Sequence, residues 1–254
     1  MYKSRPTSHK GDNGVLYVVA GSRQYHGSLW YVVELASQLV DLIYVETDVT
    51  NLPLLRQLKK IHPALIPVAS RQRARYLGKS NCLLLGPGLG RSLASQQQVQ
   101  RLLRHPCCPI KRVIDADALY YLTSKLITTN TVITPQAAEF RALFGKQSAA
   151  QASRHWPGII VAKGPVDYVC QAGRCRRIVG GNAGLTKGGT GDVLAALIAS
   201  LGCVVPMTTA CVMATQAIKH TAQHLAKKFG TFYSTRQVIA QLPQVLAHFN
   251  ELSK

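Results

Sequence analysis

Short, continuous apolar runs alternate along the chain with longer segments in which apolar residues recur every three or four positions. The short runs predict buried strands, and the longer segments predict helices that pack on them. Strands are expected at 15–20, 42–45, 64–68, 81–85, 113–114, 131–133 and 158–162, followed by a hairpin at 168–172 and 175–179. Helices are expected at 29–40, 52–60, 71–77, 93–103, 119–122, 140–144, 191–201, 207–229 and 235–252, the last capped by Ser234. This alternation predicts an α/β fold, with a mainly parallel central sheet and helices on both faces.

Six loops that follow predicted strands contain glycines or carboxylates. They are 20–28, 86–90, 115–117, 134–139, 163–167 and 182–192. In a parallel sheet, ligands bind beyond the carboxyl ends of the strands, on the connecting loops. We therefore expect these loops to converge on one ligand site.

The glycine-rich segment Asn182–Asp192, N-A-G-L-T-K-G-G-T-G-D, runs directly into the apolar run Val193–Leu201. Glycines let the backbone approach an anion closely, and the first free N–H groups of a helix point at that anion. Asp192 would lie in the first turn and face the same spot. This is the layout of a phosphoryl-transfer site. The alternative is a glycine-rich turn with Asp192 as a favourable charge at the helix N-terminus.

Two further glycine-containing loops could form walls of the same site. The loop Gly21–Ser28 matches neither the fingerprint G-x-G-x-x-G nor a P-loop, so it is either a ligand wall or a plain turn. The segment Gly86–Gly90, G-P-G-L-G, would let a flat ligand lie against bare backbone, or it is a rigid turn. Lys163, which ends a predicted strand, would project into the cleft and neutralise phosphate; the alternative is an ordinary surface lysine.

The chain has only 11 acidic residues, yet Asp115, Asp117, Glu139 and Asp192 all fall in these loops. We expect Asp117 to cap the next helix, with a water-mediated Mg²⁺ site at Asp115 and Asp117 as the alternative. A capping box from Thr134 to Glu139 would be too long, so Glu139 is expected to favour the helix N-terminus by its charge. Gln136, in the same loop, is expected to face the cleft and hydrogen-bond an amide or a phosphate.

With 254 residues, of which 47% are hydrophobic, the chain can form one domain with a sizeable core. No apolar run reaches the roughly 18 residues that a membrane span needs. The segment 1–10 is polar and basic without the apolar part of a signal peptide, so we expect a cytoplasmic protein. The seven cysteines, with no C-x-x-C, are interpreted as small buried residues in a reducing cytosol. His220 and His224 are interpreted as a packed or solvated helix face rather than as metal ligands.

A net charge of +19 is compatible with nucleic-acid binding, with anionic substrates or with a general basic bias. The lysines and arginines are dispersed, with mild clusters at 71–75 and 174–177, and there is no arginine-rich tail. We therefore expect no nucleic-acid partner.

Seven stretches carry a further signal when they are taken in order along the chain. They are H-K-G-D-N-G (9–14), V-V-A-G-S-R-Q-Y-H-G-S (18–28), G-P-G-L-G-R-S (86–92), V-I-D-A-D-A-L (113–119), I-T-P-Q-A-A-E-F (133–140), V-A-K-G (161–164) and N-A-G-L-T-K-G-G-T-G-D-V-L (182–194). As an ordered set they resemble the NAD(P)H-hydrate dehydratase family of the ribokinase-like superfamily, from about His9 to Leu246. The resemblance implies a ribokinase-like three-layer α/β/α fold with a mainly parallel central sheet.

The same resemblance implies a single dehydratase domain at 9–254 after a basic arm at 1–8, without the epimerase domain that is often fused to it. It implies dehydration of hydrated NADH or NADPH, driven by ADP or ATP with Mg²⁺, for which no strong ligand set is visible. Asp192 would take the proton of the ring's 6-hydroxyl, which attacks the terminal phosphate of the nucleotide. Phosphate would then leave and restore the reduced nicotinamide. A homo-oligomer, a tetramer, is implied as well.

Site residues follow from the resemblance by position. The catalytic set would be Gly189, Thr190, Gly191 and Asp192, whose backbone N–H groups hold the developing charge. The nucleotide side would be lined by Lys163, Gly164, Pro165, Val166, Asp167 and Gly191. The hydrate side would be lined by Ser28, Gly88, Gly90, Gln136 and Asp192.

The chain also departs from the family pattern at three places. Gln136 stands where the family usually has histidine, Ser28 where alanine is common, and Thr186-Lys187 where Ala-Thr is usual. Lys187 would add positive charge beside the anion site. Two alternatives to the dehydratase remain: a small-molecule kinase of the same superfamily that acts on a sugar or vitamin-precursor alcohol, and a decayed member that binds anions or nucleic acid.

Overall fold

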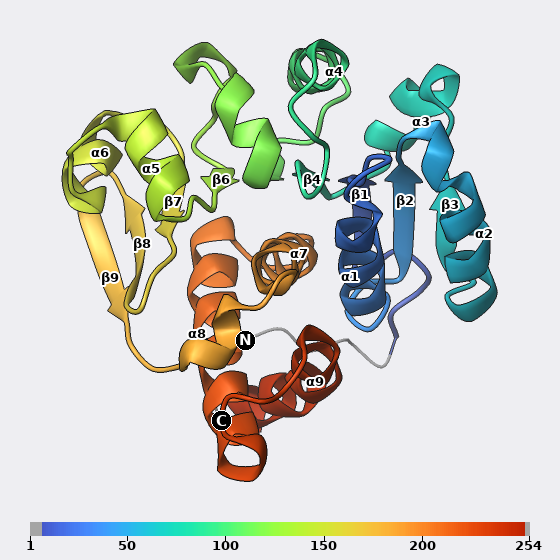
Figure 1. Cartoon of the computed structure of the whole chain (residues 1–254). Coiled ribbons are helices and arrows are strands. Elements are labelled where there is room, and N and C mark those ends of the chain that lie inside the picture. Colours follow the sequence, from blue (N-terminus) through green and yellow to red (C-terminus); the bar gives the residue numbers. More distant parts are fainter. Residues whose placement is uncertain (1–6, 252–254) are drawn as a thin grey trace.

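Nine strands of the described residues form one sheet whose order brings distant segments of the chain together. The computed structural model describes residues 7–251, so residues 1–6 of the expected arm and residues 252–254 lie outside the description. The strands are β1 (Val15–Val19), β2 (Leu42–Glu46), β3 (Leu65–Pro67), β4 (Cys82–Leu85), β5 (Lys111–Ile114), β6 (Thr131–Ile133), β7 (Ile159–Ala162), β8 (Asp167–Gln171) and β9 (Arg174–Ile178). Their order is β3-β2-β1-β4-β5-β6-β7-β8-β9, and β8 alone runs in the direction opposite to that of the other eight strands (Figure 1). The mainly parallel sheet is thus confirmed.

Helices cover both faces of this sheet. One face carries α1 (His26–Ala36), α2 (Leu52–Ile61), α7 (Thr190–Gly202), α8 (Met207–Phe229) and α9 (Thr235–Glu251). The other face carries α3 (Arg73–Leu77), α4 (Leu93–Leu103), the 3₁₀-helix η3 (Ala116–Tyr121), α5 (Ala137–Phe144) and α6 (Ala149–His155). Figure 1 shows α4 on one side of the sheet and α7 on the other. The three-layer arrangement is therefore confirmed.

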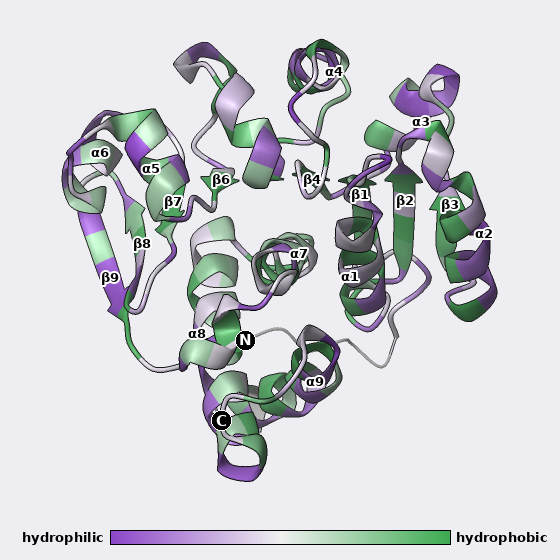
Figure 2. Cartoon of the chain, viewed as in Figure 1, coloured by the Kyte–Doolittle hydropathy of each residue, from purple (hydrophilic) through white to green (hydrophobic). Residues whose placement is uncertain are grey.

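The centre of the first face is helix α7, in which every residue of Val193–Gly202 is buried. The strands meet it with alternate side chains, because Leu16 and Val18 pack on this face while Tyr17 and Val19 pack on the other. Strands β1 and β2 are hydrophobic along their length, whereas the outer helix α2 carries hydrophilic residues (Figure 2). Each fully buried aliphatic side chain contributes about 1.5–3 kcal/mol, so the position of α7, and with it the helix N-terminus, is fixed by the core.

Most predicted elements are present, but two helices differ from expectation. The helix expected at 119–122 is the 3₁₀-helix η3, which already begins at Ala116. Helix α6 was not predicted at all, although its start carries a capping box: Ser148 N donates to Gln151 Oε1 (2.9 Å) and Gln151 N donates to Ser148 Oγ (3.3 Å). The predicted cap of the last helix is confirmed, since Ser234 Oγ accepts from Gln237 N (3.3 Å).

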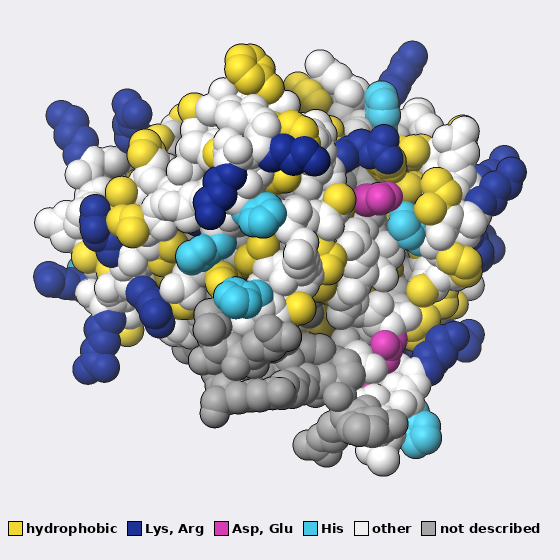
Figure 3. Space-filling view, turned by 90° about the horizontal axis from the view of Figure 1, so that it is seen from below, with side chains coloured by type: hydrophobic (Ala, Val, Ile, Leu, Met, Phe, Trp, Pro, Cys, Tyr) yellow, Lys and Arg dark blue, Asp and Glu magenta, His cyan; other side chains and the backbone are white. Residues whose placement is uncertain are grey.

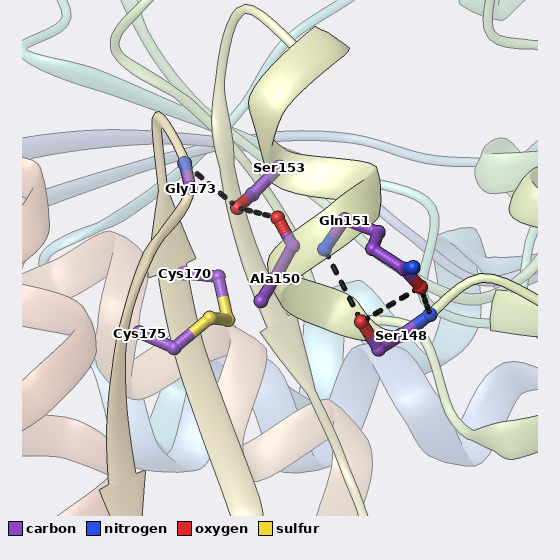
Figure 4. The surroundings of a disulfide bond; sticks show 7 residues. All are labelled: Ser148, Ala150, Gln151, Ser153, Cys170, Gly173 and Cys175. Atoms are coloured by element: carbon purple, nitrogen blue, oxygen red, sulfur yellow. Dashed lines mark hydrogen bonds between the residues drawn. A yellow bond between two sulfur atoms is a disulfide. The ribbon is translucent and has the colours of Figure 1, made fainter.

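Two of the cysteines form a disulfide, which corrects their interpretation as buried thiols. Cys170 on β8 and Cys175 on β9 are paired directly across the hairpin and are bonded (Figure 4). The turn between these strands consists of Ala172 and Gly173, both with positive φ, and a two-residue turn of this kind sets the register of the hairpin. That register brings the two sulfur atoms together. The other five cysteines are free thiols, and all but Cys107 are buried.

Charged and histidine side chains are distributed over the face of the molecule that is shown in Figure 3. No helix in 7–251 is long and apolar enough to cross a membrane. Lysine and arginine side chains lie both at the rim of that face and near its middle, beside several histidines (Figure 3). His220 and His224 lie exposed on α8, as expected, and the His220 ring packs edge-on against Phe249 at 5.2 Å. They line an open cavity of about 750 Å³ between α8 and α9 that shares no residue with the strand-end loops.

Candidate active site

The loops that follow β1, β4, β5, β6 and β7 meet at one edge of the sheet. Backbone hydrogen bonds tie them to the neighbouring strand or loop: Gly21 N to Pro87 O (2.8 Å), Asp115 N to Leu85 O (3.1 Å), Thr134 N to Ile114 O (3.2 Å) and Lys163 N to Pro135 O (3.0 Å). The glycine-rich segment joins them, because a Cβ on Gly191 would lie 3.3 Å from Lys163 Nζ. The predicted convergence of the six loops is therefore confirmed.

The glycines of 86–90 are needed mainly because other backbone lies against them. A Cβ on Gly86 would lie 1.9 Å from Asp115 O, and a Cβ on Gly88 would lie 2.5 Å from Tyr25 O and 2.8 Å from Ser28 Cβ. Both glycines also have positive φ. The rigid-turn interpretation therefore holds for Gly86 and Gly88. The absence of a side chain at Gly88 lets the loop that contains Ser28 pack against it. Gly90 is more open on its Cα side, where Ser22 Oγ is the nearest atom at 3.7 Å from a Cβ, although its N–H is bonded to Asp117 Oδ2 (2.9 Å).

The glycine-rich segment ends in a left-handed glycine that starts helix α7. Gly189 is the N-cap with φ +90°, and a Cβ there would lie 2.3 Å from the ring of Tyr31. Gly188 has open space beside it, with nothing within 4 Å of a Cβ. The amides of Gly191 and Asp192 lie in the first turn, where a helix offers no carbonyl acceptor. The result is an anion cradle of bare backbone at the positive end of a fixed helix.

Side chains from elsewhere in the chain hold this cradle in shape. Thr190 Oγ1 donates to Leu185 O (2.6 Å) and to Lys187 O (2.9 Å), so the threonine braces the loop with its side chain. Tyr233 donates to Asn182 Oδ1 (2.7 Å), and Thr235 Oγ1 donates to Gly188 O (2.8 Å). The start of α9 thus supports the segment from outside, a role that sequence reasoning missed.

Lys187 does not supply its charge to the cradle as the sequence suggested. Its ammonium donates to Thr231 O and lies 5.2 Å from the ring centroid of Tyr233. The side chain therefore clamps the glycine-rich segment to the loop before α9.

Asp192 is the carboxylate at the mouth of the cradle. Burial and the negative charges of Asp115 and Asp117 raise its pKa to about 6, while the hydrogen bond from Ser28 and the charge of Lys163 lower it. Ser28 comes from the loop after β1, and Lys163 comes from the end of β7. The carboxylate thus lies between two predicted sides of the site and can take up a proton near neutral pH.

Lys163 and Asp115 form a largely buried ion pair whose two charges both act on this carboxylate. Asp115, which is 1% exposed, accepts from Thr134 Oγ1 (2.6 Å) and from Lys163 Nζ (2.9 Å). Burial lowers the pKa of Lys163, but the charges of Asp115, Glu139 and Asp192 outweigh it, so the net pKa is raised. The lysine does reach the cleft, as predicted, but its ammonium is already paired there and is not a free cation.

Asp117 does not cap the next helix, which corrects the sequence-based expectation. Its carboxylate accepts from Gly90 N (2.9 Å) and from Arg91 Nε (3.0 Å), so it holds the 86–90 loop. The intervening Ala116 has φ +50°, an uncommon value for a residue other than glycine. This backbone conformation sends the two carboxylates of the segment to different neighbours, where they fasten two loops.

Gln136 and Glu139 belong to the start of helix α5, whose capping box was not predicted from the sequence. Glu139 Oε2 accepts from Gln136 N (2.8 Å), the reach-back bond of a capping box that begins at Gln136 and not at Thr134. Gln136 is exposed at the N-cap position, and Glu139 is buried. Gln136 is therefore open to a ligand at the strand ends.

The segment 163–167 exposes its first half and buries its end. Gly164 and Pro165 are exposed and Val166 is half-buried, whereas Asp167 is only 6% exposed. Asp167 Oδ1 accepts from Gly164 N (2.8 Å), and its other oxygen lies 3.3 Å from Lys219 Nζ. Asp167 thus shapes the loop from inside.

No cluster of three or more metal-ligating side chains occurs among residues 7–251. Asp115 and Asp117, the alternative Mg²⁺ site of the sequence analysis, are both occupied by cationic or amide partners. Mg²⁺ usually binds through one or two carboxylates together with substrate phosphates. The donors present fit an ion that arrives on nucleotide phosphates, with Asp192 closest to the anion cradle.

Comparison with known proteins decides the family. The family model described as NAD(P)H-hydrate dehydratase matches residues 16–244. The chain belongs to this family. The match includes all six strand-end loops, so the resemblance drawn from the motifs is confirmed for the family.

Two curated relatives cover nearly all of this chain. The bifunctional NAD(P)H-hydrate repair enzyme Nnr of Pyrobaculum aerophilum is 29% identical over 98% of this chain, which spans 53% of that protein. The ATP-dependent (S)-NAD(P)H-hydrate dehydratase of Drosophila melanogaster is 27% identical over 95% of this chain and 87% of its own length. The chain therefore spans about half the length of the bifunctional relatives and most of the length of the dehydratase.

Solved structures confirm the ribokinase-like fold. A ribokinase-like superfamily protein from Enterococcus faecalis is 25% identical, with a TM-score of 0.86 over 97% of this chain and 91% of that one. The ADP/ATP-dependent NAD(P)H-hydrate dehydratase of Bacillus subtilis, crystallised with ATP and Mg²⁺, is 22% identical, with a TM-score of 0.82 over 98% of this chain and 94% of that one.

Proposed function

We propose that the chain catalyses the nucleotide-dependent dehydration of hydrated NADH or NADPH. The observation that carries the proposal is Asp192, a carboxylate with a pKa of about 6 at the mouth of a backbone anion cradle. General-base catalysis is most effective when the pKa of the base lies near the working pH. The family and the names of its dehydratase members supply the substrate class.

In this proposal Ser28 orients the Asp192 carboxylate on the hydrate side, and Lys163 lies on the nucleotide side. Asp192 takes the proton of the substrate's ring hydroxyl while that oxygen attacks the terminal phosphorus of ATP or ADP, and ADP or AMP leaves with the electron pair of the broken P–O bond. The amides of Gly191 and Asp192 hold the negative charge that develops on the phosphoryl oxygens. The C–O bond of the resulting phosphate ester then breaks with its electron pair leaving on phosphate, and a proton passes from the neighbouring ring carbon to water, which restores the ring double bond.

Nucleotide and metal fit the residues of the site. The space beside Gly188 and the missing side chain of Gly191 leave room for phosphate oxygens, and the exposed residues Gly164 and Pro165 follow Lys163, whose ammonium lies next to Gly191. Mg²⁺, when bound to the nucleotide, would neutralise charge on the phosphates. The Drosophila relative is named for ATP, and the Bacillus protein is named for both nucleotides and was crystallised with ATP and Mg²⁺.

The test is a single assay with two variants. Purified protein is mixed with hydrated NADH, Mg²⁺ and either ATP or ADP, and recovery of the reduced-nicotinamide absorbance is recorded. We expect recovery with the wild type and none with Asp192→Asn. Asp12→Asn makes the same chemical change at an exposed residue before β1 and should leave the rate unchanged. Phosphorylation of an added alcohol without turnover of the hydrate would replace the dehydratase by a small-molecule kinase.

The predicted tetramer and the predicted cytoplasmic location belong to the same proposal. The tetramer rests on the resemblance to the family. Sedimentation equilibrium at micromolar concentration tests the tetramer, and a monomer under these conditions would contradict it.

A further inference from the structure

A buried lysine on α8 reaches the same segment of the site from behind. Lys219 is 4% exposed and lies on the inner face of the helix, in line with Thr215 and Ala222, which are also buried. A buried ammonium needs charge and hydrogen-bond partners, because burial removes its hydration. The partners of Lys219 therefore indicate why the chain keeps a lysine there.

Within residues 7–251, the hydrogen-bond and ion-pair partners of the Lys219 ammonium belong to one short loop. Its Nζ donates to Gly164 O (3.0 Å) and to Pro165 O (3.1 Å), and it lies 3.3 Å from Asp167 Oδ2. The other oxygen of Asp167 accepts from Gly164 N (2.8 Å). Lys219 therefore binds two carbonyl groups of this loop, and Asp167 binds one of its amides.

The stem of Lys219 also shapes the entrance to the glycine-rich segment. Gly181, with φ +74°, packs on it so closely that a Cβ would lie 2.8 Å from Lys219 Cδ. Gly181 directly precedes Asn182, where the segment begins. One side chain therefore contacts the 163–167 loop and the residue that directly precedes the glycine-rich segment.

We infer that Lys219 is a positioning residue for the nucleotide. It turns the Gly164 and Pro165 carbonyls inward and neutralises Asp167, whose carboxylate would otherwise repel the nucleotide phosphates. The inference rests on the proposed function in one respect, that the ligand of this loop is ATP or ADP.

Lys219→Met removes the ammonium and keeps most of the stem. We expect the Kd for Mg-ATP, measured by calorimetry, and the nucleotide KM to rise about tenfold, while kcat stays within about twofold. Lys219→Arg should recover part of the affinity. Lys227→Met is the matched control, since Lys227 is exposed two turns further along the same helix, and it should leave both constants unchanged.

The double variant Lys219→Met/Asp167→Asn distinguishes the loss of nucleotide positioning from a folding defect. It removes both charges of the buried pair, which leaves no uncompensated charge in the core. We expect it to fold and still to bind nucleotide weakly, because the two loop carbonyls have lost their donor. A folded double variant with wild-type Kd and KM overturns the inference. Wild-type protein that binds Mg-ATP but does not convert the hydrate overturns only the proposed reaction, and wild-type protein that binds no nucleotide overturns both.

Discussion

The loop after β5 and the first turn of α7 each bring an aspartate to the same edge of the sheet, but their surroundings differ. Asp115 accepts from Thr134 and from Lys163 and is almost fully buried. Asp192 is hydrogen-bonded by Ser28, and within residues 7–251 no cation lies at ion-pair distance from it. The Asp115 carboxylate is therefore bonded within the fold, while the Asp192 carboxylate can still accept a proton from a ligand.

This difference assigns roles that residue type alone cannot assign. A paired carboxylate fixes loops, as Asp115 does for the ends of β6 and β7 and as Asp117 does for 86–90. A buried carboxylate without a counter-ion keeps a raised pKa and can exchange a proton near neutral pH. The paired aspartate even contributes to the raised pKa of the unpaired one.

The largest expected effect is that of Asp192→Asn. Removal of a general base should lower kcat by about 10³-fold or more.

Asp192→Asn should also change the stability of the protein. The folded-state pKa of Asp192 is about 6, above the ordinary value of 3.8, so ionisation of this carboxylate lowers the stability of the wild type as pH rises from 3.8 to about 6. The variant should therefore be more stable than wild type by about 1–2 kcal/mol at pH 7.5, and the gain should vanish near pH 4. Urea unfolding at both pH values checks this, and a less stable variant at pH 7.5 would contradict it.

Asp115→Ala should have the opposite effect on stability. It leaves the Lys163 ammonium and the Thr134 hydroxyl without their buried acceptor, which should cost about 3 kcal/mol in urea unfolding. Asp115→Asn keeps an acceptor for Thr134 and should lose less. A loss below about 1 kcal/mol for the alanine variant would mean that the pair does not hold the loops.

The fold could be predicted from the sequence because strands and helices are local patterns. The six loops could also be located, since each follows an apolar run. The side-chain partners that are distant in sequence could not be predicted. The positive φ of Ala116, which sends Asp115 and Asp117 to different partners, is not indicated by any pattern of residue types. The roles of these two carboxylates therefore had to come from the structure.

Two other features that were not predicted, the disulfide and the buried Lys219, are nevertheless indicated by the sequence. The hairpin was predicted around Gly173, and a two-residue turn at Ala172-Gly173 places Cys170 opposite Cys175. Lys219 stands at the spacing of the buried stripe of α8, so a lysine there predicts a buried partner. The identity of that partner, 52 residues away in Asp167, depends on tertiary packing and could not be read from the sequence.

A smaller effect is expected from Ser28→Ala. The hydrogen bond from Ser28 lowers the pKa of Asp192, so its removal should shift the acidic limb of the activity profile toward higher pH. Ser37→Ala, at the far end of α1, removes a hydroxyl that donates to Glu34 O and should leave the profile in place. A shift toward lower pH would contradict the placement of Ser28 beside the carboxylate.

The smallest effect is expected from Arg91→Ala. The Arg91 side chain is 57% exposed, and its partner Asp117 keeps the hydrogen bond from Gly90 N. Exposed ion pairs contribute about 0–1 kcal/mol, so thermal unfolding should change little. A loss comparable to that of Asp115→Ala would remove the distinction between the two pairs.

The pH dependence of kcat/KM for the hydrate tests the central claim most directly, because it reports the ionisation of the free enzyme's base. Activity should rise with pH as Asp192 ionises and reach half its maximum near pH 6. Asp115→Asn, which removes a negative charge that raises the pKa of Asp192, should move this midpoint to lower pH. A profile that is flat between about pH 5 and pH 8, or a midpoint that Asp115→Asn does not move, would contradict the account.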